Sequence, residues 1–148
     1  MCCWLLALLA HLALCSGCRS FDKAWKTTEE PIAKPSILGP WNGTWTSLVN
    51  GHNGALRCVV TQDKNGNFIA RFHAVYQKVL RFGYTVPLQV TETNGAFEFR
   101  GEANLGWWAG GVYQYEGYTS ETNFLSTYSC HYDHGTFQMT RPPHPAAN

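Results

Sequence analysis

The feature that most constrains the fold is a regular succession of turn signals after Trp41. Turn-forming residues recur about every thirteen residues, near positions 52, 65, 79, 94, 106, 120 and 133. Asn65-Gly66 and Asn94-Gly95 are dipeptides that accept the positive φ angles of a two-residue hairpin turn, whereas no such dipeptide stands near Val79. The spacing predicts eight short strands, at residues 41–48, 55–62, 67–77, 80–92, 96–102, 111–118, 122–129 and 135–141.

Within these segments the residues alternate with a period of two, which is typical of strands with one buried and one solvated face. In the third segment, for example, one face carries Phe68, Ala70, Phe72, Ala74 and Tyr76. Consecutive hairpins leave two exposed edges unless the first strand pairs with the last. We therefore expect an all-β fold, an eight-stranded antiparallel up-and-down β-barrel, whose interior side chains can fill or which can hold one small ligand.

Composition excludes several classes of function. The chain has 148 residues, 14% of them charged, and a net charge of +1. It carries no basic stripe, so we expect no nucleic-acid partner. His52 and His73 have no recognisable nucleophile or carboxylate partner, and there is no Gly-x-Ser-x-Gly elbow. We expect no catalytic residues and no cofactor, and interpret the chain as a non-enzyme.

The N-terminus has the pattern of an export signal. The apolar run from Trp4 to Leu14 is shorter than the roughly 20 residues of a membrane-spanning helix and ends in small residues. Its end, Leu14-Cys15-Ser16-Gly17-Cys18, resembles the lipobox of bacterial lipoproteins, although no Lys or Arg precedes the run. That resemblance implies an acylated Cys18 and a membrane-anchored place in the bacterial cell envelope, on the periplasmic or outer-membrane face. The alternative is an ordinary cleaved signal.

These patterns divide the chain into four parts. We expect a signal peptide at 1–17, a lipidated Cys18 with a flexible tether at 18–38, a barrel domain at 39–142 and a disordered tail at 143–148. The segment from Arg19 to Pro35 is polar, contains two prolines and has no periodicity, which is the basis for the tether.

A second resemblance concerns Gly43-Thr44-Trp45, which is similar to the Gly-x-Trp signature of the calycins, the lipocalins and avidins. It implies a barrel-closing clamp between Trp45 and a basic residue of the last strand, for which Arg141 stands in the matching place. The chain lacks the tryptophans of the avidin biotin pocket and the long first loop of the lipocalins. The pattern Gly51-His52-Asn53-Gly54-Ala55-Leu56-Arg57, followed by Ala70-Arg71-Phe72-His73 and Tyr113-Gln114-Tyr115-Glu116, also resembles small bacterial lipoproteins, a resemblance that implies no particular activity.

The segment Cys130-His131-Tyr132-Asp133-His134 holds several potential metal ligands. Its spacing is not that of a structural zinc site, and Asp133-His134-Gly135 suits a turn between the last two strands, so we expect a turn and no metal. Cys58 and Cys130 either form a disulfide or remain separate thiols, and the sequence leaves both alternatives open.

The aromatic residues of the inward face lead to a hypothesis about function. We expect the barrel to bind a small apolar or amphipathic ligand, with the loop from Leu105 to Gly111 as a lid or contact surface. The candidate ligand-binding residues are Phe72, Tyr76, Phe99, Trp107, Trp108, Tyr113, Tyr115, Phe124 and Tyr128. Small inward residues, Ala70, Ala74, Gly101 and Gly117, would leave room for the ligand. The alternative is a barrel filled by its own aromatics that acts as a structural or protein-interaction module.

Overall fold

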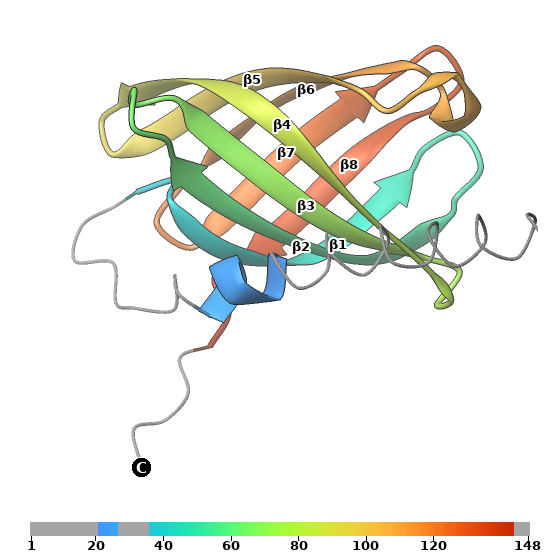
Figure 1. Ribbon diagram of the computed structural model, residues 1–148, viewed down its shortest axis with the longest axis horizontal. Coiled ribbons are helices and arrows are strands. Elements are labelled where there is room, and N and C mark those ends of the chain that lie inside the picture. The colour runs from blue at the N-terminus through green and yellow to red at the C-terminus, as the bar shows by residue number, and fades with distance from the viewer. Residues whose placement is uncertain (1–20, 27–35, 144–148) are drawn as a thin grey trace, which may run out of the picture.

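The computed structural model describes residues 21–26 and 36–143, and residues 39–140 of it form a closed antiparallel barrel of eight strands (Figure 1). Each strand pairs with its neighbours in sequence, and β1 pairs with β8. This confirms the predicted fold, and each predicted turn lies between two strands. The strands are β1 (Gly39–Ser47), β2 (Asn53–Gln62), β3 (Phe68–Tyr76), β4 (Leu80–Thr93), β5 (Ala96–Asn104), β6 (Val112–Thr119), β7 (Asn123–Ser129) and β8 (His134–Thr140).

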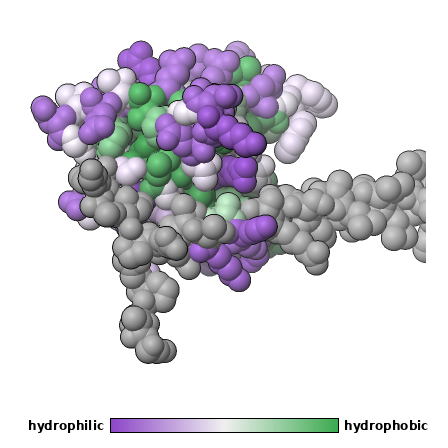
Figure 2. Space-filling model, turned by 60° about the vertical axis from the view of Figure 1, so that its left-hand side comes forward, coloured by the Kyte–Doolittle hydropathy of each residue, from purple (hydrophilic) through white to green (hydrophobic). Residues whose placement is uncertain are grey.

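The up-and-down order gives the barrel two different ends. One end, here called the mouth end, gathers the connections β1–β2, β3–β4, β5–β6 and β7–β8, at the right of Figure 1. The opposite end, here called the closed end, carries the other three turns, the segment that enters β1 and the segment that leaves β8. In Figure 2, where the left-hand side of Figure 1 comes forward, hydrophilic residues surround a smaller apolar area.

The closed half of the barrel is packed with aromatic side chains. The ring of Phe124 lies 4.8 Å from that of Phe99 and 5.6 Å from that of Trp41, measured between centroids. Ile37, just before β1, is fully buried against this cluster. Buried aromatic contacts of this kind contribute about 0.5–1.5 kcal/mol per pair beyond the burial of area. The closed half therefore supplies much of the hydrophobic core.

A cationic clamp seals this end. The guanidinium carbon of Arg141 lies 3.6 Å from the centroid of the Trp41 ring. The same guanidinium donates hydrogen bonds to the backbone carbonyls of Ser36, Leu38 and Pro40. Burial lowers the pKa of Arg141 to about 10, so the group remains charged at neutral pH. It ties the segment before β1 to the residue after β8.

The predicted pairing of Arg141 with Trp45 is wrong. Asn42 is level with Thr140 in the β1–β8 register, which brings Arg141 level with Trp41. Trp45 lies four residues further along the same face, about 13 Å away at the rise of a strand. There its indole N–H donates to the carbonyl of Val75 at 3.0 Å. The Gly-x-Trp segment that meets the basic residue is thus Gly39-Pro40-Trp41.

Gly43 shows how tightly β1 and β8 approach one another. A Cβ atom at this position would lie 2.0 Å from the carbonyl oxygen of Gln138, which no side chain could tolerate. Gly43 is level with Met139 of β8, so the absence of a side chain lets the first and last strands meet. The glycine of the predicted signature serves barrel closure.

Residues 21–26 are helical and pack on the outer wall of the barrel (Figure 1). Phe21 is buried, its ring 5.4 Å from the imidazole of His73 on β3. Arg57 of β2 lies 5.2 Å from the centroid of the Phe21 ring and 3.7 Å from a carboxylate oxygen of Asp22. The described part of the segment expected as a tether is therefore ordered against the barrel. The expected signal peptide, Cys18 and the tail residues 144–148 lie outside the described residues.

In residues 21–26 and 36–143, no helix has the length and apolar character needed to cross a lipid bilayer.

Candidate ligand-binding pocket

The mouth half of the barrel contains a cavity of about 550 Å³. Its walls come from the inward faces of the strands and from the mouth-end loops, and ten of its lining side chains are aromatic. A cavity of this volume falls in the range of small-molecule sites. The aromatic lining residues are Trp45, Tyr76, Phe82, Tyr84, Trp108, Tyr113, Tyr115, Tyr128, Tyr132 and Phe137, and the others are Asn50, Leu56, Ala74, Leu105, Ala109, Gly110 and Asp133.

The difference between the two halves follows from side-chain size along the strands. Of the four small inward residues expected to leave room, only Ala74 lines the cavity. The space beside Gly101 is occupied by Val86 and Leu88, and that beside Gly117 by Phe99. The space beside these two glycines is thus filled by larger neighbours, whereas Ala74 borders the cavity.

Tyrosine hydroxyls and one carboxylate give the cavity its polar character. Tyr128 donates to Asp133 Oδ2 at 3.0 Å, and Ser47 donates to Asp133 Oδ1 at 2.6 Å. The hydroxyl of Tyr113 donates to the carbonyl of Ala109 at 2.9 Å. The rings of Tyr84 and Tyr115 stack, with their centroids 6.1 Å apart.

Burial raises the pKa of each of these four tyrosines well above its ordinary value. Their hydroxyls are therefore neutral across physiological pH and can act as hydrogen-bond donors or acceptors. Among the described residues that line this cavity, Asp133 is the only one of the Asp, Glu, Lys, Arg or His classes.

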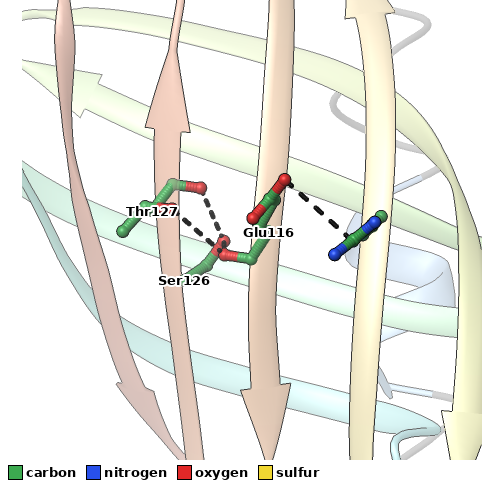
Figure 3. A network of polar contacts seen from close by, with 4 residues as sticks. Glu116, Ser126 and Thr127 are labelled. Atoms are coloured by element: carbon green, nitrogen blue, oxygen red, sulfur yellow. Dashed lines mark hydrogen bonds and ion pairs between the residues drawn. The ribbon is translucent and has the colours of Figure 1, made fainter.

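Another inward hydroxyl belongs to Ser126 of β7, and it is already used within the wall. It donates to the backbone carbonyl of Glu116 on the adjacent strand at 2.9 Å (Figure 3). The hydroxyl of Thr127 reaches the same carbonyl, at 3.4 Å. On the outer surface the Glu116 carboxylate lies 4.0 Å from Arg100. Ser126 thus stabilises the β6–β7 pairing and does not line the cavity described above.

The loop between β5 and β6 arches over the mouth. It contains the short 3₁₀ helix η1 (Trp107–Ala109), flanked by Gly106 and Gly110 with φ angles of 88° and 100°. The backbone bond from Leu105 N–H to the Gly111 carbonyl, 2.9 Å long, closes the base of the loop. Trp108 lines the cavity while remaining 77% exposed, and Trp107 is 89% exposed. The loop presents one tryptophan to the cavity and one to solvent.

The sequence-based candidates fall into three groups. Five of them line the cavity, namely Tyr76, Trp108, Tyr113, Tyr115 and Tyr128. Phe72, Phe99 and Phe124 are buried in the core cluster and do not line it, and Trp107 faces solvent. The sequence interpretation missed Phe82 and Tyr84, although both lie on the inward face of the predicted fourth strand, where the alternation would have identified them.

The potential metal segment is a turn. Residues 130–133 connect β7 to β8, and the Cys130 N–H donates to the Asp133 carbonyl at 2.8 Å. In the part of the chain that the structure describes, no three His, Cys, Asp or Glu side chains gather closely enough to hold a metal ion. Cys58 and Cys130 are both free thiols, and burial raises the pKa of Cys58.

Comparison of the chain with protein-family models, with curated proteins and with solved structures found no match. The resemblances to calycins and to bacterial lipoproteins therefore stay predictions.

Proposed function

We propose that this protein binds a small apolar or amphipathic molecule in the mouth half of its barrel. The observation that carries the proposal is the cavity of about 550 Å³, lined by ten aromatic side chains, above a closed half that is filled and sealed by Arg141. Apolar pockets with a few convergent polar groups are the usual form of small-molecule sites. The residues proposed to contact the ligand include Tyr76, Trp108, Tyr113, Tyr115 and Tyr128.

The lining also favours one polarity for the ligand. Asp133 supplies a carboxylate, and the lining residues that the structure describes include no Lys, Arg or His. The faces of tyrosine and tryptophan rings attract cations through their quadrupoles. The polar end of the ligand is therefore proposed to be neutral or cationic, because a ligand carboxylate would meet no positive partner in the cavity.

The cellular setting remains a proposal from the sequence. We place the protein in the bacterial cell envelope, anchored through an acylated Cys18, on the basis of the lipobox-like segment. The alternative of a wholly filled barrel that acts as an interaction module is less favoured, because only the closed half is filled. The proposal involves binding and no chemical step.

Native mass spectrometry of the protein, purified without detergent, tests the proposal. The expected result is an additional mass that is removed by organic extraction. Two probes of equal chain length, dodecyltrimethylammonium and dodecanoate, then test the polarity, and the cationic probe is expected to be retained more strongly. A protein that carries no ligand and retains neither probe would contradict ligand binding. Equal retention of both would contradict only the assigned polarity.

A further inference from the structure

The exposed apolar side chains of the described residues are concentrated at the mouth end. Ten large hydrophobic residues are exposed, and nine of them lie in or beside the four mouth-end connections. The exception is Tyr118, on the outer wall of β6. The nine, here called the mouth rim, are Leu48, Val49, Val79, Leu80, Phe82, Trp107, Trp108, Val112 and Tyr132.

The mouth rim is a ring and not a groove, because each of the four connections contributes to it. Trp107 is 89% exposed, Val79 79% and Tyr132 71%, although these residues come from three different loops. Single exposed apolar residues are ordinary on protein surfaces, but a set that encircles one opening marks an interaction surface. The rim surrounds the entrance to the cavity, to which Phe82, Trp108 and Tyr132 also belong.

Charge is distributed unequally between the two ends. The mouth-end segments 48–52, 77–82, 105–112 and 130–134 contain Lys78, Arg81 and three histidines. Their only carboxylate, Asp133, accepts hydrogen bonds from Ser47 and Tyr128 and keeps its charge, so two cations stand against one anion when the histidines are neutral. The closed-end turns 63–67, 94–95 and 120–122 contain Asp63 and Glu121 against Lys64, and the guanidinium of Arg141 at this end is held in the clamp on Trp41.

From these observations we propose that the mouth rim docks on the surface of an anionic lipid bilayer. Tryptophan and tyrosine favour the membrane interface, where one part of the ring is apolar and the other hydrated. Lys78 and Arg81 match anionic headgroups, whereas the acidic turns of the closed end would be repelled. A ring of short loops fits a deformable surface on all sides of the opening. Docked in this way, the cavity opens toward the lipid. The inference is independent of the proposed ligand and of any lipid anchor.

Hydrogen–deuterium exchange of the full chain tests the orientation, with vesicles of phosphatidylcholine and phosphatidylglycerol as the probe. Amides in segments 48–52, 77–82, 105–112 and 130–134 are expected to exchange more slowly when vesicles are present. Those in the turns 63–67, 94–95 and 120–122 are expected to be unchanged. An anchor at the N-terminus could bring the protein to the vesicle but would not by itself protect these four segments. Absence of protection, or equal protection at both ends, would overturn the proposal.

Two matched pairs of variants test the chemistry by vesicle co-sedimentation. Trp107→Ala is expected to weaken vesicle binding by about tenfold, because a buried Trp contributes more than 1.4 kcal/mol. Tyr118→Ala, which removes the exposed aromatic outside the rim, should leave it unchanged. Lys78→Gln is expected to weaken binding by about fivefold, as removal of one basic residue near anionic lipid should, while Lys64→Gln at the closed end should not.

If neither Trp107→Ala nor Lys78→Gln differs from its control, the lipid proposal is wrong. It is also wrong if vesicles give no protection because the mouth rim binds a protein partner. A failure of the lipid-docking proposal can be distinguished from a failure of the ligand-binding proposal. Trp107 does not line the cavity, so the ligand mass retained by Trp107→Ala should equal that of the unmodified protein.

Discussion

At the scale of single residues, two alanines on the same face of β3 stand in different halves of the barrel. Ala74 lines the cavity, whereas Ala70 is fully buried and paired with Val60 and Val86. We expect Ala74→Leu to reduce ligand or probe retention with little change in stability. Ala70→Leu should lower the free energy of unfolding by about 1–3 kcal/mol through overpacking and leave binding intact. Urea unfolding and native mass spectrometry measure the two effects. Equal destabilisation by both would mean that the mouth half is also filled.

Arg141 is a second single residue on which the barrel depends. Its guanidinium stacks on Trp41 and donates to backbone carbonyls before β1, so Arg141→Gln removes a cation–π contact and several charge-assisted hydrogen bonds. We expect a loss of about 3 kcal/mol in the free energy of unfolding. The control is Arg100→Gln, since the ion pair of Arg100 with Glu116 is exposed and should contribute less than about 1 kcal/mol. A thermal melt of Arg141→Gln that matches the control would contradict the clamp.

At the scale of elements, the β3–β4 turn has a backbone conformation that does not suit its residues. Gln77 and Lys78 have φ angles of 48° and 63°, although neither is glycine, asparagine or aspartate. The N–H of Val79 donates to the carbonyl of Tyr76 at 3.2 Å, within the three-residue loop that joins the paired residues Tyr76 and Leu80. Replacing Gln77-Lys78 by Asn-Gly should raise the free energy of unfolding by about 1–2 kcal/mol.

The β4–β5 turn offers the reciprocal control for this replacement. Asn94-Gly95 already adopts positive φ angles, 53° and 79°, with residues that accept them. Exchanging Asn94-Gly95 for Gln-Lys should lower stability by a similar amount. Both changes are read as shifts in the urea midpoint. An Asn-Gly variant of the β3–β4 turn that unfolds at the same urea concentration as the unmodified protein would show that the backbone there is not strained.

The elements also show which features of the fold could be predicted from the sequence and which could not. Strands and turns could be predicted because alternation and turn chemistry are local. The pairing of Arg141 with Trp41 could not, because it depends on the β1–β8 register, which joins residues about one hundred positions apart and is set by barrel closure. The helix at 21–26 is too short to show a period and is stabilised by contacts of Phe21 with the barrel.

The extent of the candidate site could be predicted only in part, again because it depends on contacts between residues that are far apart in the sequence. Phe124 and Tyr115 both point inward in the alternating pattern, yet only Tyr115 lines the cavity. Alternation assigns a side chain to the interior but does not say whether its neighbours fill the space around it. That depends on how residues from several strands combine, as when Phe99 occupies the space beside Gly117.

At the scale of the whole molecule, the buried tyrosines predict how stability depends on alkaline pH. Burial raises the pKa of Tyr84, Tyr113, Tyr115 and Tyr128 in the folded protein, whereas in the unfolded chain these hydroxyls ionise near the ordinary value of about 10. Above that pH the unfolded state releases protons that the folded state retains. The contribution of these four protonated hydroxyls to the free energy of unfolding is therefore fully present below pH about 10 and is lost as the pH rises further.

We expect the free energy of unfolding, measured with urea, to be nearly constant from about pH 7 to 8. It should begin to fall above about pH 8.5, where the Cys58 thiol ionises only in the unfolded chain, and fall more steeply above pH about 10. Each tyrosine that remains protonated only in the folded state contributes about 1.4 kcal/mol per pH unit to the slope. Tyr115→Phe should reduce the slope by about that amount, because Tyr115 is only 2% exposed. Tyr118→Phe, on the outer wall, is the matched control. A slope unaffected by Tyr115→Phe would mean that the Tyr115 hydroxyl reaches water, and the cavity would then be wetter than its aromatic lining suggests.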